Sequence, residues 1–151
     1  MSLEQEIISI LQKTAEHVSV RSMLGRYAAN LPKDDAEKLE RGRWLDEIAR
    51  NDFKMEPEDT VVVRKLLLSL FEEIGTESGN PVALRYASFA YGRGDNDLTV
   101  ERRENGWTIH AAPDFARAVA LGRKAVEAGD NIAAKALPGL ERDLREKGLK
   151  P

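Results

Sequence analysis

Residues whose side chains could move a proton gather in one short stretch of the sequence. Glu101, Arg103 and His110 would share one face of a short β-hairpin, and Tyr91 comes shortly before it. A carboxylate, a cation and an imidazole held together could act as a general acid and base. The same residues fit an ordinary surface pair, because Glu101 and His110 would face each other across two antiparallel strands. We therefore name no catalytic residue.

Other reactive groups are scarce in this sequence. It has no cysteine, so thiol nucleophiles, thiolate zinc sites and disulfides are excluded, and a reducing compartment, the cytoplasm, is expected. The only two histidines, His17 and His110, are far apart in the chain, so no histidine-rich metal site is expected. The glycines at 92 and 94 follow a predicted helix, which is the reverse of the order in a dinucleotide-binding fingerprint. We expect neither a cofactor nor a metal.

Composition narrows the class of protein further. The 151 residues, 42% of them hydrophobic, fit a single helical domain spanning residues 1–151. With 23 Lys and Arg against 26 Asp and Glu, the formal charge is -3, which argues against nucleic acid as a partner. The longest apolar stretch, residues 61–71, is interrupted by charges and is shorter than the roughly 20 residues of a membrane span. We expect no association with a membrane.

Helical periodicity covers most of the chain. We predict helices at about 3–21, 22–30, 35–51, 57–74, 81–91, 114–128 and 131–147, with the last one kinked or split at Pro138. The helix at 57–74 is apolar on nearly every side, so it should occupy the centre of the domain. The expected fold class is mainly α, with six to seven helices in an orthogonal or solenoid-like bundle around this central apolar helix.

One β-hairpin, at about residues 98–111, is inserted among the helices. Asn105-Gly106 suits the two central positions of a type I′ turn, because both positions need a positive φ. A turn at these residues pairs Glu104 with Trp107. Alternation along the strands then places the apolar side chains on one face, which should lie on the helices. These side chains are Leu98, Val100, Trp107, Ile109 and Ala111.

Two segments of the chain are similar to each other. Residues 77–84 read Glu-Ser-Gly-Asn-Pro-Val-Ala-Leu and residues 127–134 read Glu-Ala-Gly-Asp-Asn-Ile-Ala-Ala, and the first copy continues to Tyr-Gly-Arg-Gly at 91–94. This pattern resembles Sel-one-like repeats, relatives of the tetratricopeptide helical hairpins, over about residues 58–94 and 113–148. The spacing of Gly79 and Gly129 exceeds the usual repeat by about the length of the hairpin. The resemblance implies a protein-binding scaffold without catalytic residues.

The leading hypothesis is a non-catalytic protein-interaction or adaptor module, of which a small inhibitor or immunity-type protein would be one form. Tryptophan and arginine are residue types that protein interfaces favour. The alternative is a small enzyme or small-ligand-binding protein with a cleft between the hairpin and the helix at 81–91. We expect a protein partner, with a homodimer as one option. The module would act through a charged hairpin and helical surface that includes Tyr91, Arg93, Glu101, Arg102, Arg103, Trp107 and His110.

Overall fold

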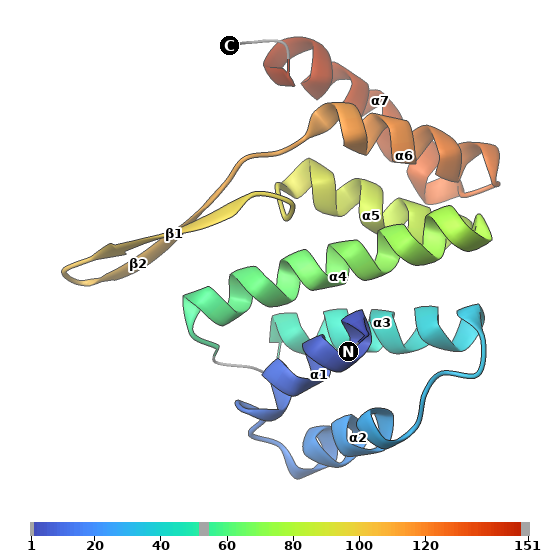
Figure 1. Ribbon diagram of the computed structural model, residues 1–151. Helices are drawn as coiled ribbons and strands as arrows, with labels where there is room; N and C mark the ends of the chain where they lie inside the picture. Colours follow the sequence, from blue (N-terminus) through green and yellow to red (C-terminus); the bar gives the residue numbers. More distant parts are fainter. Residues whose placement is uncertain (1, 52–54, 149–151) are drawn as a thin grey trace.

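The helices of this protein lie side by side, largely in chain order. The computed structural model describes residues 2–51 and 55–148 (Figure 1). From α3 to α7, consecutive helices run in opposite directions and each packs on the next, with the hairpin between α5 and α6. The fold is therefore mainly α, a solenoid-like stack with one inserted hairpin. Its elements are α1 (Leu3–Gln12), α2 (Val18–Ala29), α3 (Asp35–Asn51), α4 (Pro57–Ser78), α5 (Pro81–Arg93), β1 (Leu98–Arg103), β2 (Gly106–Ala111), α6 (Phe115–Glu127), α7 (Asn131–Asp143) and a final π-helical turn (Leu144–Gly148).

The central helix is α4, as its apolar pattern predicts. It packs against α1, α3 and α5 and also contacts both strands of the hairpin. Pro57 stands at its first turn, and Glu58 and Asp59 complement the positive end of the helix dipole. The buried side chains of α4 belong to one hydrophobic cluster that includes residues from every helix between α1 and α7. Removing their apolar surface from water is the main force that holds the stack together.

The end of α4 lies one turn beyond the predicted end at residue 74. Gly75 does not stop the helix but is buried against α5, where a Cβ atom would come within 3.0 Å of Leu84. The chain turns instead at Gly79, whose φ of 72° suits a left-handed helix cap. Asn80 then caps the first turn of α5 with its side chain, which accepts from the N–H groups of Val82 and Ala83.

The predicted continuous helix over residues 3–21 is wrong. The first helix ends at Gln12, and α2 begins at Val18 after a non-helical segment. Val20 and Leu24 are buried, and α2 packs against α1. A single straight helix would carry these two side chains away from the core, so burial of both apolar segments requires the chain to turn between them. At the start of α1, Ser2 and Gln5 form a capping box, in which each side chain bonds to the backbone N–H of the other residue.

The predicted break at Pro138 is also wrong in part, because α7 is not split there. The helix continues through Pro138 to Asp143. Proline removes the hydrogen bond to the carbonyl four residues earlier, at Ala134, and both residues are exposed. Water can therefore satisfy that carbonyl, so the helix tolerates the proline.

A buried ion pair fixes the first two helices to α3. The guanidinium of Arg41, which is 6% exposed, donates to Glu4 of α1 and to Glu37, each at 3.0 Å. It also donates to the backbone carbonyl of Asn30, just after α2. The same guanidinium lies 4.5 Å from the ring centre of Tyr27, and burial raises the pKa of that phenol. Arg41 thus joins α1, α2 and α3 at one point.

The hairpin forms, but its strands pair in a register two residues away from the predicted one. Arg103 pairs with Gly106, so Glu104 and Asn105 occupy the turn, and neither has a positive φ. A shift of two residues leaves every side chain on its predicted face. The face that carries the apolar side chains therefore stays the same, with Arg102 now directly opposite Trp107.

The base of the hairpin explains the observed register. The predicted pairing would have placed Leu98 opposite Pro113, which has no backbone N–H to donate. In the observed register, the N–H of Ala112 donates to the carbonyl of Asp97 at 3.0 Å. The ladder therefore extends to the residue before the proline without losing a hydrogen bond.

Candidate functional site

The predicted interface residues fall into separate groups in the structure. One group lies on the outward face of the hairpin, a second lies on its inward face, and two residues of α5 lie apart from both. They do not all line one cleft, because only Arg93 and Trp107 are among the residues that line the groove described below. The outward group is Glu101, Arg103 and His110, the inward group is Arg102 and Trp107, and the residues of α5 are Tyr91 and Arg93.

The outward group is a hydrogen-bonded surface cluster. The Nε2 atom of His110 lies 2.5 Å from Glu101, and Arg103 donates to the other oxygen of that carboxylate at 3.3 Å. The contact between Glu101 and His110 is diagonal, because His110 is directly opposite Thr99. The hydrogen bond from His110, followed by that from Arg103, lowers the pKa of Glu101. None of the three residues lines either of the two hollows described below.

We expect an NMR titration to find the carboxyl of Glu101 with a pKa below the ordinary glutamate value. A lowered pKa means that the contacts are complete at neutral pH and are lost as the pH falls through the pKa of the folded state. His110→Gln should raise this pKa more than Arg103→Gln, because the histidine contributes the larger effect. An unchanged Glu101 titration in both variants would contradict the cluster.

The inward group anchors the hairpin to the beginning of α4. Arg102 donates to both carboxylate oxygens of Glu58, at 2.6 and 2.7 Å, and lies 3.7 Å from Glu56. This contact lowers the pKa of Glu58 and raises that of Arg102. The hairpin nevertheless extends past the helix stack (Figure 1), and Trp107 remains 48% exposed. The inner part of this face therefore lies on the helices, and its end near the turn overhangs the core, as expected from the charged Arg102 and Glu104 on that part of the face.

Tyr91 has a structural position between three helices. Its hydroxyl donates to Glu72 of α4 at 3.1 Å, and Arg117 of α6 donates to the other oxygen of the same carboxylate. Burial and the neighbouring Glu72 carboxylate raise the pKa of Tyr91. The tyrosine is thus engaged in joining α4, α5 and α6 and is not a member of the hairpin cluster.

The main concave surface lies beside α5, but α3 and α4 form its other walls. One hollow, of about 170 Å³, has an apolar floor that includes Leu67, Leu68 and Phe71, with Tyr86 and Phe89 from α5 at its side. A second hollow, of about 570 Å³, extends along α3 and the first half of α4 to Trp107 on the hairpin. The two hollows share four residues and thus form one surface, which we call the central groove. The shared residues are Asp46, Arg50, Arg64 and Leu67.

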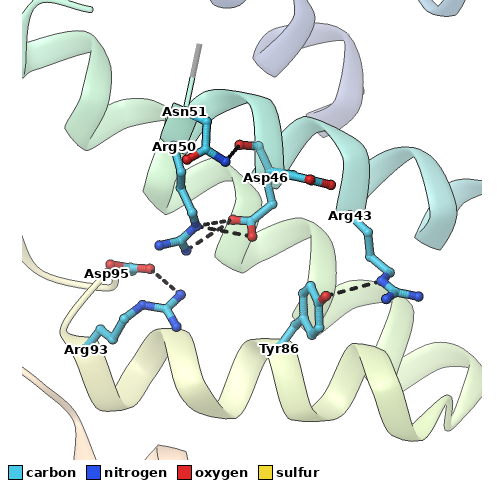
Figure 2. A network of polar contacts seen from close by, with 8 residues as sticks. Arg43, Asp46, Arg50, Asn51, Tyr86, Arg93 and Asp95 are labelled. Carbon is cyan, nitrogen blue, oxygen red and sulfur yellow. Dashed lines mark hydrogen bonds and ion pairs between the residues drawn. The ribbon is translucent and has the colours of Figure 1, made fainter. Parts of the chain in front are cut away.

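Two ion pairs stand on opposite sides of the central groove (Figure 2). Asp46 and Arg50, one turn apart on α3, are 3.2 Å apart, and Arg93 and Asp95 at the end of α5 are 3.1 Å apart. Asp95 is buried, whereas Arg93 is exposed toward solvent. Each carboxylate in the described lining is therefore already paired with an arginine. That described lining also contains neither histidine nor serine.

A third arginine in the lining gives the groove a positive excess. Arg64 of α4 lines both hollows. Arg43 of α3 lines neither hollow but donates to the hydroxyl of Tyr86, a lining residue, at 3.2 Å (Figure 2). Among the residues that the structure describes, neither arginine forms an ion pair. The groove therefore combines an apolar floor with a rim on which arginines outnumber carboxylates.

Most groove residues were not singled out from the sequence. Arg93 and Trp107 were predicted as interface residues, whereas Asp46, Arg50 and Arg64 were not. One signal was present, since Arg64 lies with Lys65 within the longest apolar stretch, residues 61–71, where burial of a charged side chain would be costly. The predicted cleft between the hairpin and the helix at 81–91 differs from the observed groove, to which the hairpin contributes Trp107 alone among the described lining residues.

The geometry defines a helical stack with a projecting hairpin and an arginine-rimmed groove. Within residues 2–51 and 55–148, no group of three or more histidine, aspartate or glutamate side chains is placed to hold a metal ion. The described helices also include none with the length and apolar character needed to cross a membrane. No protein-family model matches this chain, and no curated protein or solved structure matches it either. The resemblance to Sel-one-like repeats stays a prediction.

Proposed function

We propose that this chain is a non-catalytic protein-interaction module that binds a segment of a partner protein in the central groove. The observation that carries the proposal is the continuity of the groove from Tyr86 and Phe89 to the exposed Trp107. Interfaces commonly combine buried aromatic anchors with arginines at their centre. The absence of cysteine from the sequence supports action in the cytoplasm.

The size of the smaller hollow indicates what the partner presents to it. A dry cavity of about 150 Å³ accepts one benzene molecule, whereas pockets for whole ligands usually measure about 300–1,000 Å³. The hollow of about 170 Å³ beside Phe89 thus fits one apolar side chain. The second hollow, of about 570 Å³, falls within the range for whole ligands. It is the continuity of the groove from the smaller hollow to Trp107 that favours a protein segment over a small-molecule substrate.

The charge of the groove rim indicates which residues flank the apolar side chain of the partner segment. Among the described lining residues, Arg64 carries a positive charge that no carboxylate offsets by an ion pair, and Arg50 and Arg93 line the same hollow. Arg43, outside the lining, adds a further cation next to Tyr86. An acidic residue on the partner would complement this rim, and complementary charge sets specificity and association rate. We infer that the partner segment carries an apolar or aromatic anchor next to aspartate or glutamate.

Selection of random peptides displayed on phage tests this proposal directly. We expect the immobilised protein to enrich sequences in which an apolar anchor lies beside acidic residues. Arg64→Glu should weaken binding of a selected synthetic peptide by about tenfold or more, since tenfold in Kd is about 1.4 kcal/mol. The measurement is a fluorescence anisotropy titration of the labelled peptide.

Lys65→Glu is the matched control for this titration. Lys65 is the next residue on the same helix, is exposed and lines neither hollow, so the same charge reversal should leave the Kd almost unchanged. Equal losses in the two variants would mean that net charge, and not the groove, determines binding. Failure to enrich any peptide would contradict the proposed function itself.

A further inference from the structure

The two strands of the hairpin differ in how they protect their free edges. A two-stranded sheet leaves one edge of each strand unpaired, and proteins usually blunt such edges with charged side chains, proline or a covering element. β1 carries Glu101, Arg102 and Arg103, and Arg102 is tied to α4. β2 reads Gly-Trp-Thr-Ile-His-Ala and has no aspartate, glutamate, lysine, arginine or proline. The edge of β2 is therefore the unprotected one.

The backbone groups that β2 offers can be assigned from the ladder. The N–H of Ala112 donates to the carbonyl of Asp97 at the base of the hairpin. Together with the register, this hydrogen bond identifies which residues of β2 bond to β1 and which do not. In an antiparallel ladder every second residue points its N–H and C=O toward the opposite edge. On β2 these residues are Trp107, Ile109 and Ala111. They alternate with residues that bond to β1, so the free edge offers a regular row of donors and acceptors.

The side chains of β2 suit pairing with an identical strand. We propose that β2 pairs antiparallel with β2 of a second copy of this chain, with the two-fold axis at Thr108 or Ile109. Directly opposite residues share a face, so Trp107 would lie opposite Ile109 or Ala111 of the second copy, apolar against apolar. No like charges meet across the axis, because β2 has no acidic or basic residue other than His110.

The resulting four-stranded sheet accounts for two features of the isolated hairpin. A two-stranded sheet alone is marginally stable, and this one extends past the helix stack (Figure 1). Trp107 remains 48% exposed on the apolar face of the hairpin. In the dimer the apolar faces of the two hairpins join into one continuous face. Each Trp107 then has apolar side chains of the other copy beside it. A symmetric, self-complementary contact of this kind is the commonest form of oligomer.

The absence of cysteine from the sequence allows a sharp test by single cysteine substitutions. Cα and Cβ atoms of residues at the two-fold axis come close enough for a disulfide. Thr108→Cys or Ile109→Cys should therefore give a covalent dimer under mild oxidation. Thr99→Cys on β1 is the control, since it is more exposed than either and would react more readily through random collision. Non-reducing electrophoresis measures the covalent dimer.

A second measurement is the mass of the wild-type protein in solution, which shows whether it is a dimer without any cysteine. Sedimentation or light scattering should give twice the mass of one chain for the wild-type protein. A monomer at all concentrations tested would overturn the proposal. A dimer whose cross-linking is as fast at residue 99 as at residues 108 and 109 would also overturn it, because the copies would then meet through another surface. Circular dichroism of each variant verifies that it is folded.

Discussion

Replacing Arg41 with alanine is expected to lower the free energy of unfolding by about 3–5 kcal/mol, because removing one partner of a buried ion pair leaves the other charge buried and uncompensated. The remaining partner is Glu4, which is 4% exposed and has one carboxylate oxygen that already lacks a hydrogen bond. Arg41 also bonds to the carbonyl of Asn30 and to Glu37. The loss would therefore loosen α1 and α2 from α3 together.

Urea denaturation followed by circular dichroism measures this loss, and Arg50→Ala is its control. Arg50 lies on the same helix and pairs with Asp46 one turn away, but its side chain is exposed to solvent. Exposed pairs of this kind contribute about 0–1 kcal/mol. Equal destabilisation by the two substitutions would mean that the buried pair adds nothing beyond an ordinary surface contact.

The second large effect is expected at Gly94, the residue that ends α5 and leads into the hairpin. Gly94→Ala should destabilise the fold by about 2–5 kcal/mol, the sum of about 1–2 for a left-handed backbone and about 1–3 for overpacking. Its φ is 81°, and an added Cβ would lie 2.8 Å from the Cβ of Ala111 and 3.0 Å from the backbone nitrogens of Ala112 and Pro113. These backbone atoms cannot move without disturbing the base of the hairpin.

Gly79→Ala separates the two causes of that loss. Gly79 has a similar φ of 72°, but an added Cβ there would meet no atom within 4 Å. The Gly79→Ala substitution should therefore lower the free energy of unfolding only by the backbone contribution, about 1–2 kcal/mol. Thermal or chemical unfolding of the two variants gives the comparison. Equal losses would show that the close approach of Gly94 to the hairpin does not matter for stability.

Local signals predicted much of the fold. Asn80 before Pro81, together with Asp114 and Asp130, marks helix starts through side chains that bond to backbone N–H groups within the next three residues. Such contacts need no information from elsewhere in the chain. The apolar pattern of residues 57–74 likewise indicated the central helix, because a helix without a polar face must be surrounded.

The errors arise where distant residues decide the outcome. The break between α1 and α2 depends on how both helices pack, and the hairpin register depends on Pro113, which lies outside both strands. Gly75 follows the predicted end of the central helix at residue 74, but the helix continues through it. The absence of a side chain at Gly75 instead lets Leu84 of the next helix pack closely. In each case a contact between elements overrides the local preference of the residue.

The candidate site was predictable only in part for the same reason. The cluster of Glu101, Arg103 and His110 follows from alternation along two adjacent strands, and the structure brings these three residues together. The central groove instead collects Asp46, Arg64 and Phe89 from three different helices. No periodicity within one helix reveals which neighbouring helix its side chains will face, so this part of the site requires the tertiary structure.

The order of the helices in the stack also has a consequence for how the chain folds. From α3 to α7 each helix packs on its neighbour in sequence, so these contacts join segments that are close in the chain, although α5 and α6 meet across the hairpin. Domains rich in such local contacts fold quickly, because little chain entropy is lost before each contact forms. The exception is α1, which packs on α4 across the whole of α2 and α3. Closing this longer loop loses more chain entropy than the other helix contacts do. The buried ion pair between Glu4 of α1 and Arg41 of α3 offsets part of that loss.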